Sequence, residues 1–431
     1  MLKNNKITFT AFIFAIFLLN SASICQAQVR ISSPYTRYGL GEIQNNFLSR
    51  NMAMGGITYG LRDPRLINFG NPASYTSYDT NTFVCDIGLI SNFNQIQTAN
   101  VTQGYTNYST LGYLVFGFPV TKWMGATFGL VPYSKTGYQI IAADTLDNIG
   151  RVVQKYDGSG GLNRFFAGTS FLMFKRLSLG VNVSYLFGTI SKNRAVYFPD
   201  MTYTYNFRVR NQLIIYDFAT EIGLQYQQPF GKDYSLTFGG KYSLPMGMRS
   251  TRDYFAERFT TTSAGDDVVK DTIEQTSGQL GITYMPMTIG GGVVMKKGDK
   301  WLVGADFTWE NWAAYKSYGV KDSIGNSWRI STGGQYTPKG SSVSGFFSRM
   351  SYRLGFRYGK TSLQLYDNDV NEYAVSLGFG VPVRRSRSTI NVAFEFGKRG
   401  NTTNNLIQEN FGKITLGVGI RENWFFRRKL E

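Results

Sequence analysis

The amino-acid sequence predicts an all-β fold, a transmembrane antiparallel β-barrel of about 14 strands. Three observations predict it: an N-terminal export signal, a long series of alternating apolar and polar residues, and no later apolar run long enough for a transmembrane helix. An unpaired backbone group costs several kcal/mol in hydrocarbon, so strands cross a membrane only when their sheet closes. Aromatic residues form 16% of the chain and glycine occurs 48 times, as interfacial girdles and a curved wall require.

The export signal is predicted in residues 1–27. Lys3 and Lys6 supply a short positive start, and an apolar run follows at 7–19. This run is shorter than the roughly 20 residues that a membrane-spanning helix needs. The order of a positive start, an apolar core and a polar stretch is typical of a cleaved secretory signal.

Cleavage is expected near Ala27, which places Cys25 and Ala27 at the small-residue positions. A lipoprotein anchored at Cys25 is less favoured, because Ile24 precedes it where a small residue is expected. After cleavage the chain keeps Cys85 alone, so an internal disulfide is excluded.

Strand-like segments begin near residue 82. The first shows the alternation, with Phe83 and Cys85 on one face and Asp86 on the other. An even number near 14 is expected, because bacterial single-chain barrels have even strand numbers. The predicted strands are approximately 83–90, 108–119, 123–133, 163–174, 177–192, 200–210, 212–230, 234–246, 249–262, 279–297, 301–314, 345–359, 370–383, 388–398 and 409–425.

Two lengths of connection alternate between these strands, and each length predicts a side of the membrane. The short turns are expected on the periplasmic side: 121–122, 175–176, 231–233, 298–300 and 384–387. The longer polar stretches are expected to face outward: 92–107, 134–162, 263–278, 315–344 and 399–408. The alternative is an exported soluble β-sandwich or propeller, which the two-residue turns and the aromatic ending Trp424-Phe425-Phe426 disfavour.

Several motifs resemble the FadL family of outer-membrane transporters for hydrophobic compounds. They are Met52-Ala53-Met54-Gly55-Gly56, Asn71-Pro72-Ala73, Met285-Pro286 with Gly290-Gly291-Gly292, the run Trp301, Asp306, Trp309 and Trp312, the motif Tyr352-Arg353-Leu354-Gly355, and Gly160-Gly161-Leu162-Asn163 with 177–182. The last pair is similar to members from Bacteroidetes-type bacteria. Their order along the chain carries the resemblance.

The resemblance implies a domain division. Residues 28–80 are expected to form a plug inside the barrel lumen, and residues 81–431 the barrel itself. The plug residues expected to meet the wall or a ligand are Gly55, Gly56, Asn71, Pro72 and Ala73. The alternative is a periplasmic tail without a gating role.

Prolines and glycines within strands predict kinks, because proline removes a ladder hydrogen bond. Pro286, Gly290 and Gly291 are the candidates for a wall kink. The resemblance implies that such a kink opens a lateral exit for apolar ligands. The alternative is an ordinary strand end at the membrane interface, which is favoured for Pro119 and Pro245.

Arg349, Arg353 and Arg357 are spaced by four, so in one strand they share a face, expected to be lumenal. Such a row is able to bind a ligand carboxylate, or it pairs with lumenal Asp306 and Glu395 as a structural network. Basic residues in loops and turns are expected to meet outer-membrane lipid and lipopolysaccharide phosphates.

Enzymatic activity is not predicted. The chain contains no histidine, so it lacks Ser-His-Asp and Cys-His sites and histidine metal ligands. No metal, no cofactor and no nucleic-acid partner is expected.

The expected location is the outer membrane of a Gram-negative cell. The expected function is transport of a hydrophobic small molecule, such as a long-chain fatty acid, through a plugged barrel with lateral release. The alternative is a non-transport barrel that serves as a subunit of an outer-membrane protein assembly or secretion complex. The sequence leaves both open.

Overall fold

A computed structural model describes residues 33–44, 47–98, 104–201, 204–262, 265–338, 345–365, 368–383, 386, 388–403 and 406–423. The predicted signal peptide, the rest of the expected N-terminal segment before residue 33, and the terminal aromatic residues Trp424 to Phe426 lie outside the described residues. Among the described residues, no helix is long and apolar enough to cross a bilayer.

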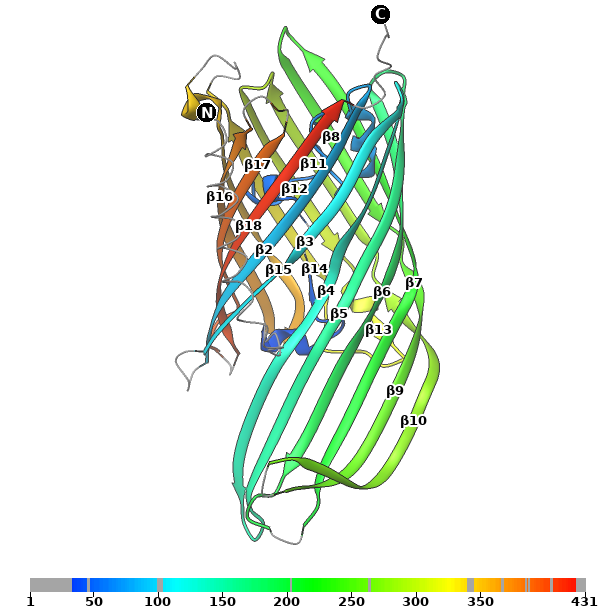
Figure 1. The fold of residues 1–431 in the computed structure, drawn as a ribbon, viewed down its shortest axis with the longest axis vertical. Helices are drawn as coiled ribbons and strands as arrows, with labels where there is room; N and C mark the ends of the chain where they lie inside the picture. Colours follow the sequence, from blue (N-terminus) through cyan, green and yellow to red (C-terminus); the bar gives the residue numbers. More distant parts are fainter. Residues whose placement is uncertain are drawn as a thin grey trace, which may run out of the picture. The chain divides into compact units, whose positions relative to one another are not determined.

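The barrel is a closed antiparallel sheet of 14 strands. Pairing of the last strand with the first closes it, and Thr415 lies opposite Ile90 in that register. In Figure 1 the red β18 runs beside the blue β2. The continuous strands are β2 (Thr82–Gln97), β3 (Gly104–Thr121), β4 (Met124–Leu146), β5 (Gly150–Met173), β6 (Leu177–Tyr197), β7 (Asn206–Phe230), β12 (Trp301–Glu310), β14 (Ser327–Tyr336), β15 (Ser351–Leu365), β16 (Asn368–Pro382), β17 (Thr389–Arg399) and β18 (Gln408–Asn423).

Two further barrel strands are each interrupted by a proline. One consists of β8 (Tyr234–Ser243) and β9 (Met246–Thr261), and the other of β10 (Asp267–Met285) and β11 (Thr288–Lys297). The register is the same on both sides of the interruptions, with Ser243 opposite Thr288 and Met246 opposite Met285. The breaks therefore lie at the same level of the wall.

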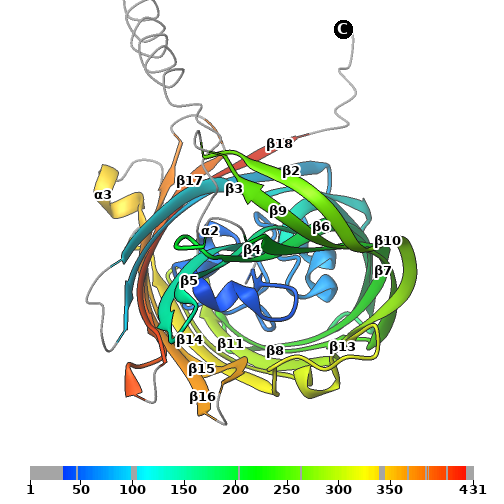
Figure 2. The ribbon, with the colours of Figure 1, turned by 90° about the horizontal axis from the view of Figure 1, so that it is seen from below.

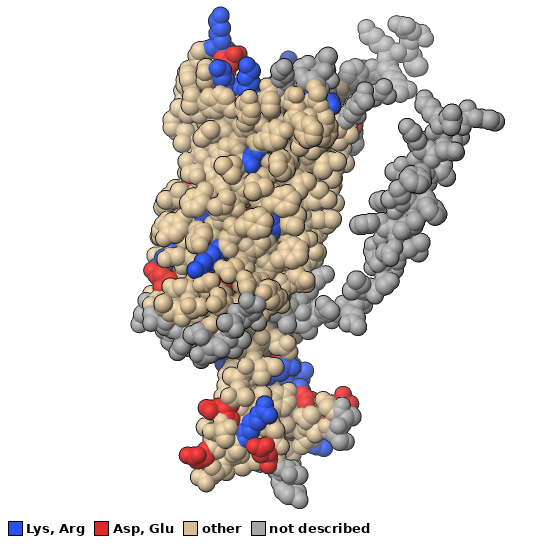
Figure 3. Space-filling model, turned by 90° about the vertical axis from the view of Figure 1, so that its left-hand side faces the viewer, with Lys and Arg blue, Asp and Glu red and all other residues tan. Residues whose placement is uncertain are grey.

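Successive strand residues alternate between lumen and lipid, as the period of two requires. In β2, Val84 and Ile90 are buried toward the lumen, whereas Ile87 and Leu89 are exposed. Aromatic side chains meet near the short turns, including Trp123 with Phe171. One face of the molecule is mostly uncharged along the barrel, and charged residues gather toward the ends (Figure 3).

Six strands continue well past the others on the side of the longer connections. We call this extension the outward leaf; it consists of the outer parts of β4, β5, β6, β7, β9 and β10 and protrudes at the bottom of Figure 1. β5 has 24 residues, which is roughly 80 Å at 3.3 Å per residue. A spanning strand needs only about 10 residues, so the leaf reaches beyond the membrane.

Several predicted boundaries are wrong. Residues 327–336 form β14, although 315–344 was expected to be a loop. The stretches 134–162 and 263–278 are largely strands of the outward leaf, and β7 is one strand where two were expected. The leaf strands are solvated, so polar residues occupy positions that an apolar residue holds within a bilayer, and the alternation is weak.

The N-terminal residues lie within the ring of strands (Figure 2). Their elements are short: η2 (Pro34–Arg37), β1 (Glu42–Ile43), α2 (Ser49–Met52) and η3 (Pro72–Ser77). Three others lie outside the main ladder: η4 (Trp312–Ala314), β13 (Lys316–Ser317) and α3 (Phe346–Arg349). We call residues 33–44 and 47–80 the plug.

Candidate functional site

Asn71, Pro72 and Ala73 seat the plug against the wall. The Asn71 side chain accepts a hydrogen bond from the Ala73 amide at 3.1 Å, which starts η3. Its amide group donates to the plug carbonyl of Tyr59 at 2.8 Å and to the wall carbonyl of Leu224 at 3.1 Å. Ala73 is fully buried, so this motif connects the plug to the barrel wall.

Gly55 and Gly56 form the turn after α2. Their φ angles are +68° and +87°, a left-handed conformation that residues with a side chain rarely adopt. A Cβ at Gly55 would lie 2.7 Å from the wall carbonyl oxygens of Phe356 and Thr332. This close approach of two backbones requires glycine.

Glycines on the wall provide the matching surface. A Cβ at Gly355 would overlap the Gly55 nitrogen, and a Cβ at Gly239 would overlap the Tyr59 carbonyl. The same overlap with plug atoms occurs around the ring, so the plug backbone packs directly on the wall. Other wall glycines in this set are Gly125, Gly180, Gly223, Gly290, Gly333 and Gly417.

Asp306, in β12, holds the plug by hydrogen bonds. Its carboxylate accepts from the backbone amides of Thr58 at 2.5 Å and Tyr59 at 2.9 Å. Asp306 is 5% exposed and has no salt bridge among the described residues. It therefore binds plug backbone, and the expected pairing of Asp306 with the arginine row is wrong.

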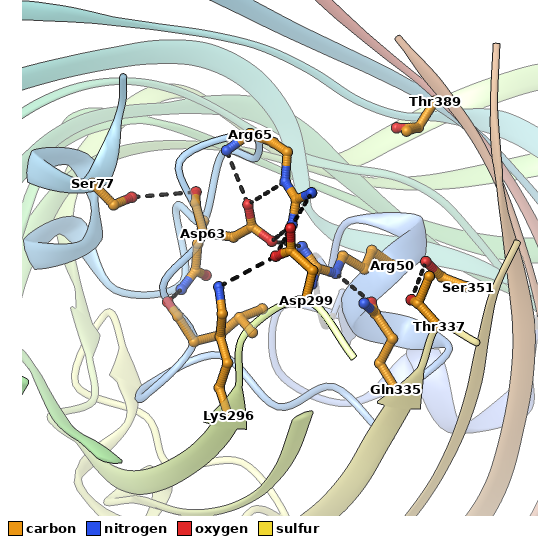
Figure 4. A network of polar contacts seen from close by, with 12 residues as sticks. Arg50, Asp63, Arg65, Ser77, Lys296, Asp299, Gln335, Thr337, Ser351 and Thr389 are labelled. Carbon is orange, nitrogen blue, oxygen red and sulfur yellow. Dashed lines mark hydrogen bonds and ion pairs between the residues drawn. The ribbon is translucent and has the colours of Figure 1, made fainter. Parts of the chain in front are cut away.

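A second connection lies at the short-turn end, where Asp63 of the plug lies between two arginines (Figure 4). Asp63 pairs with Arg50 at 2.9 Å and Arg65 at 3.0 Å, and Arg65 continues to Asp299 of the β11–β12 turn at 2.8 Å. Burial raises the pKa of Asp63, but Arg50 and Arg65 outweigh this effect and hold the pKa well below its ordinary value.

A third connection lies toward the outward side. Glu42 of β1 pairs with Arg399 at 2.7 Å, and Arg399 also pairs with Glu372 at 2.6 Å. The Ser33 hydroxyl donates to Glu409 of β18. Residues 33–44 are therefore held on one side by strands β16 to β18.

The three arginines expected in one row do not share a strand. Arg349 ends α3, and β15 begins only at Ser351. The helix replaces the predicted strand start because the chain leaves the wall between β14 and β15. Arg353 and Arg357 are lumenal and buried, at 8% and 2% exposure.

Arg357 pairs with Glu372 at 2.7 Å and with Glu395 at 3.0 Å. Its cluster is thus an ion-pair network between wall strands, which is the structural alternative for this residue. Arg353 differs, because its guanidinium donates to two neutral groups, Gln335 at 2.9 Å and Asn391 at 2.8 Å.

Of the wall-kink candidates, Pro286 lies at a strand break, and Gly290 and Gly291 lie beyond that break in β11. Pro286 lies in the break between β10 and β11, and Pro245 lies in the neighbouring break between β9 and β8. Gly290 faces the plug, where its missing side chain leaves room for the Tyr59 ring, whereas a Cβ at Gly291 would make only an ordinary contact, with the Gly239 carbonyl oxygen at 3.9 Å. Both ladders resume beyond the prolines, so each interruption is two residues long.

A longer opening in the ladder, which the sequence did not indicate, lies between β3 and β4. Their pairing ends at Leu114 and Leu130, although both strands continue outward. Beyond this point β4 pairs with the plug, because Ile43 of β1 lies opposite Ser134. We call this opening the β3–β4 seam. Pro132 adjoins a register shift in β4 close to this point.

Hydrogen bonds from the plug continue along β4. The Gln44 amide donates to the Tyr133 carbonyl at 2.9 Å, and the Ser33 amide donates to the Gly137 carbonyl at 3.1 Å. On the inner side, Leu40 packs with Leu186 of β6 and Met248 of β9. The plug segment 33–44 thus acts as an additional strand of the wall at the seam.

A cavity of about 150 Å³ adjoins this segment. Ile43 and Tyr133 line it at the seam, and Pro286 lines it at the strand break. Its remaining lining is mixed, with aromatic and methionine side chains beside the ion pair of Arg164 and Glu221. The cavity therefore lies between the seam and the proline break.

The closed barrel, the lumenal plug and the seam define the class as outer-membrane barrels of the FadL-like fold. A family model described as BamG matches residues 6–431, so the chain belongs to the BamG family. No curated protein matches it. It resides in the outer membrane.

Solved structures share the fold at low identity. A FadL homologue from Pseudomonas aeruginosa has a TM-score of 0.57 and 12% identity, covering 88% of this chain and 98% of that one. The toluene transporter TodX from P. putida has a TM-score of 0.56 and 13% identity, covering 88% and 99%. The toluene transporter TbuX from Ralstonia pickettii has 0.54 and 12%, covering 87% and 98%. At this identity the likeness shows the fold alone.

Proposed function

We propose that the protein conducts a compact hydrophobic molecule through its lumen and releases it sideways through the β3–β4 seam. The observation that supports this proposal is the end of the β3–β4 ladder at Leu114 and Leu130 beside a lumenal cavity. Among the described residues, those of plug segment 33–44 take the place of β3 beside β4 there. Release of this one segment opens the seam while the glycine-seated part of the plug stays in place.

The cavity volume sets the expected size of the ligand. A cavity of about 150 Å³ is equal in size to an engineered apolar cavity in another protein that holds benzene. A single-ring compound therefore fits without movement of the plug. A long-chain fatty acid requires displacement of residues 33–44, and its affinity comes from about 0.8 kcal/mol per buried CH₂.

A cross-link across the seam tests this proposal. Ile43 and Ser134 are register partners, and such pairs lie about 4.5–5.5 Å apart, within disulfide range. The variant Ile43→Cys/Ser134→Cys is made with Cys85→Ser. Uptake of radiolabelled toluene by intact cells is measured under oxidising and reducing conditions. We expect roughly tenfold lower uptake when the disulfide is closed, and recovery on reduction.

A control variant separates the effect of the disulfide from damage caused by the substitution. The single variant Ile43→Ser on the same background removes the same side chain without a lock, and its uptake is expected to be independent of redox conditions. A closed disulfide that leaves toluene uptake unchanged contradicts release through the seam.

The second candidate is a non-transport subunit of an outer-membrane protein complex, and the outward leaf favours it. The β10 edge from Asp267 to Gly278 has no strand partner on its second side among the described residues. Apolar side chains accompany this edge, with Val269 41% and Ile273 52% exposed. Unpaired strand edges are templates for strand addition by another chain.

Charges on the edge test this candidate. The double variant Val269→Lys/Ile273→Lys is expected to remove co-purifying protein from the barrel in mild detergent, while the barrel stays folded by heat-modifiable migration on gels. The variant Thr272→Lys/Glu274→Gln, which changes the charge of the same edge by the same amount and leaves both apolar residues in place, serves as a charge-matched control. An unchanged complex in the first variant argues against the β10 edge as the interface.

A further inference from the structure

A pocket of about 400 Å³ lies at the short-turn end of the lumen. Plug residues around Asp63 form one side, and strands β14 to β18 form the other. We propose that this pocket binds a phosphate group, carried either by a lipid headgroup or by a free phosphate. The proposal is separate from the seam, because none of the seam residues lines this pocket.

Arg353 carries the first argument. Arg353 is 8% exposed, and its guanidinium donates hydrogen bonds to the neutral side-chain oxygens of Gln335 and Asn391. It forms no ion pair among the described residues. A buried charge without a counter-charge is costly, because neutral hydrogen-bond acceptors replace only part of the water that the charge has lost. A bound anion supplies the missing charge.

The other charges of the pocket do not supply it. The two carboxylates in the lining, Asp63 and Asp299, are engaged by Arg50 and Arg65. Nearby Asp86 is buried, and one of its oxygens has no hydrogen-bond partner. It too forms no ion pair with Arg353. The described lining has five arginines, Arg50, Arg65, Arg349, Arg353 and Arg421, against two carboxylates, Asp63 and Asp299. Of these arginines, Arg421 also pairs with Asp79 outside the lining.

Hydrogen-bond donors from several parts of the chain line the pocket, as a phosphate group requires. The Nε atoms of Arg349 and Arg421 are buried and lack hydrogen-bond partners. Hydroxyl groups of Thr337 and Ser351 lie in the same lining and bond to each other at 2.9 Å. Guanidinium groups bind phosphate oxygens in pairs, and such charge-assisted hydrogen bonds are about twice as strong as neutral ones.

The short helix α3 indicates how a lipid would reach the pocket. Phe346 and Phe347 are 52% and 73% exposed and closely precede Arg349 in the sequence. Figure 2 shows α3 outside the ring of strands. Aromatic residues are enriched where a protein meets the membrane surface. A phospholipid of the inner leaflet is thus able to place its chains beside these phenylalanines and its phosphate beside Arg349.

Titration calorimetry on the full-length protein in detergent tests the proposal, with inorganic phosphate and dioctanoyl phosphatidic acid as the two probes. We expect saturable binding of at least one probe, weakened at least tenfold by Arg349→Gln and by Arg353→Gln. Arg258→Gln, on the outward leaf, is the matched control and is expected to bind as the wild type does. Heat-modifiable migration verifies folding, and the half-buried Arg349 serves as the safer substitution if Arg353→Gln fails to fold.

The two probes identify the source. Tighter binding of the lipid, lost in Phe346→Ser/Phe347→Ser, assigns a lipid headgroup. Equal binding of both probes, unaffected by that variant, assigns a free phosphate. Absence of saturable binding of either probe, or equal affinity in Arg349→Gln and the wild type, overturns the proposal.

Discussion

At the scale of single residues, Gly355 sets how closely the plug approaches the wall. A Cβ there would overlap the Gly55 nitrogen and the Met54 backbone. Neither is the end of a flexible side chain, so backbone must move. The position of the plug therefore depends on glycines in the wall, which lack a side chain, as much as on hydrogen bonds.

The variant Gly355→Ala is expected to lower the thermal unfolding midpoint, because overpacking of a close contact costs about 1–3 kcal/mol. Heat-modifiable migration in detergent measures the midpoint. Gly291→Ala is the control, since a Cβ there has its nearest neighbour at 3.9 Å. Equal midpoints for both variants would show that the plug is not seated on Gly355.

The contribution of Asp63 to stability is expected to depend on pH. Its folded pKa is held below its unfolded value near 4, so its contribution to stability is present above about pH 4 and lost as the pH falls through the folded pKa. The variant Asp63→Asn leaves Arg50 buried without its partner, at a cost of about 3–5 kcal/mol. We expect the same deficit at about pH 7 and about pH 6, both above the unfolded pKa, and a smaller one in strong acid. A deficit that grows on acidification contradicts this sign.

Sequence motifs indicated several plug residues, because the roles of these residues depend on the conformation of the chain immediately around them. Gly55, Gly56, Asn71 and Pro72 carry turn and capping chemistry that a single sequence displays. Partners of lumenal arginines are not visible in this way. Arg357 of β15 meets Glu395 of β17 across the intervening strand β16, and their separation along the chain gives no sign of that contact.

At the scale of elements, the plug segment 33–44 is held differently from the rest of the plug. It contributes two register pairs to β4, the ion pair of Glu42 with Arg399, and two buried apolar residues, Tyr35 and Leu40. Residues 47–80 instead contact glycines around the ring. The first segment is therefore held by strand pairing and side-chain contacts, and the second by close packing of backbone on glycine.

The variant Leu40→Ala is expected to loosen this segment locally, because truncating a buried leucine costs about 2–5 kcal/mol. Hydrogen exchange followed by mass spectrometry should show faster exchange at the Gln44 amide, which bonds to Tyr133. Amides of Thr58 and Tyr59, held by Asp306, serve as internal references. Faster exchange across both regions would mean that the plug moves as one unit.

The wall strands were predictable wherever one face meets lipid, because the bilayer imposes alternation on the sequence. β14 was not predicted, since Gly333 and Gly334 and several polar residues weaken its apolar face. The β3–β4 seam was not predictable either. It depends on pairing between β4 and residues about 90 positions earlier in the chain, at Glu42 and Ile43.

At the scale of the whole molecule, the barrel wall is continuous in its short-turn half, whereas in its outward half the ladder between β3 and β4 is open. The plug lies within the lumen, and the leaf continues beyond the membrane with an open edge. The first feature is expected in both a transporter and a sealed subunit, whereas the seam favours transport and the leaf edge favours a partner.

Deletion of residues 29–56 is expected to raise the conductance of the barrel in planar bilayers, because it removes α2 and the contacts of Gly55 with the wall. The wild type is expected to conduct little. Unchanged conductance in a folded deletion variant would mean that residues 57–80 alone seal the lumen.

Native mass spectrometry of the protein, extracted from its own outer membrane in mild detergent, tests the proposed transport most directly. Transport predicts a monomer that carries a single apolar adduct. It also predicts that this adduct is retained for longer when the disulfide of the Ile43→Cys/Ser134→Cys variant is closed, because its release through the seam is then blocked. A stable assembly with other proteins around an empty barrel would contradict transport and assign the outward leaf to a partner.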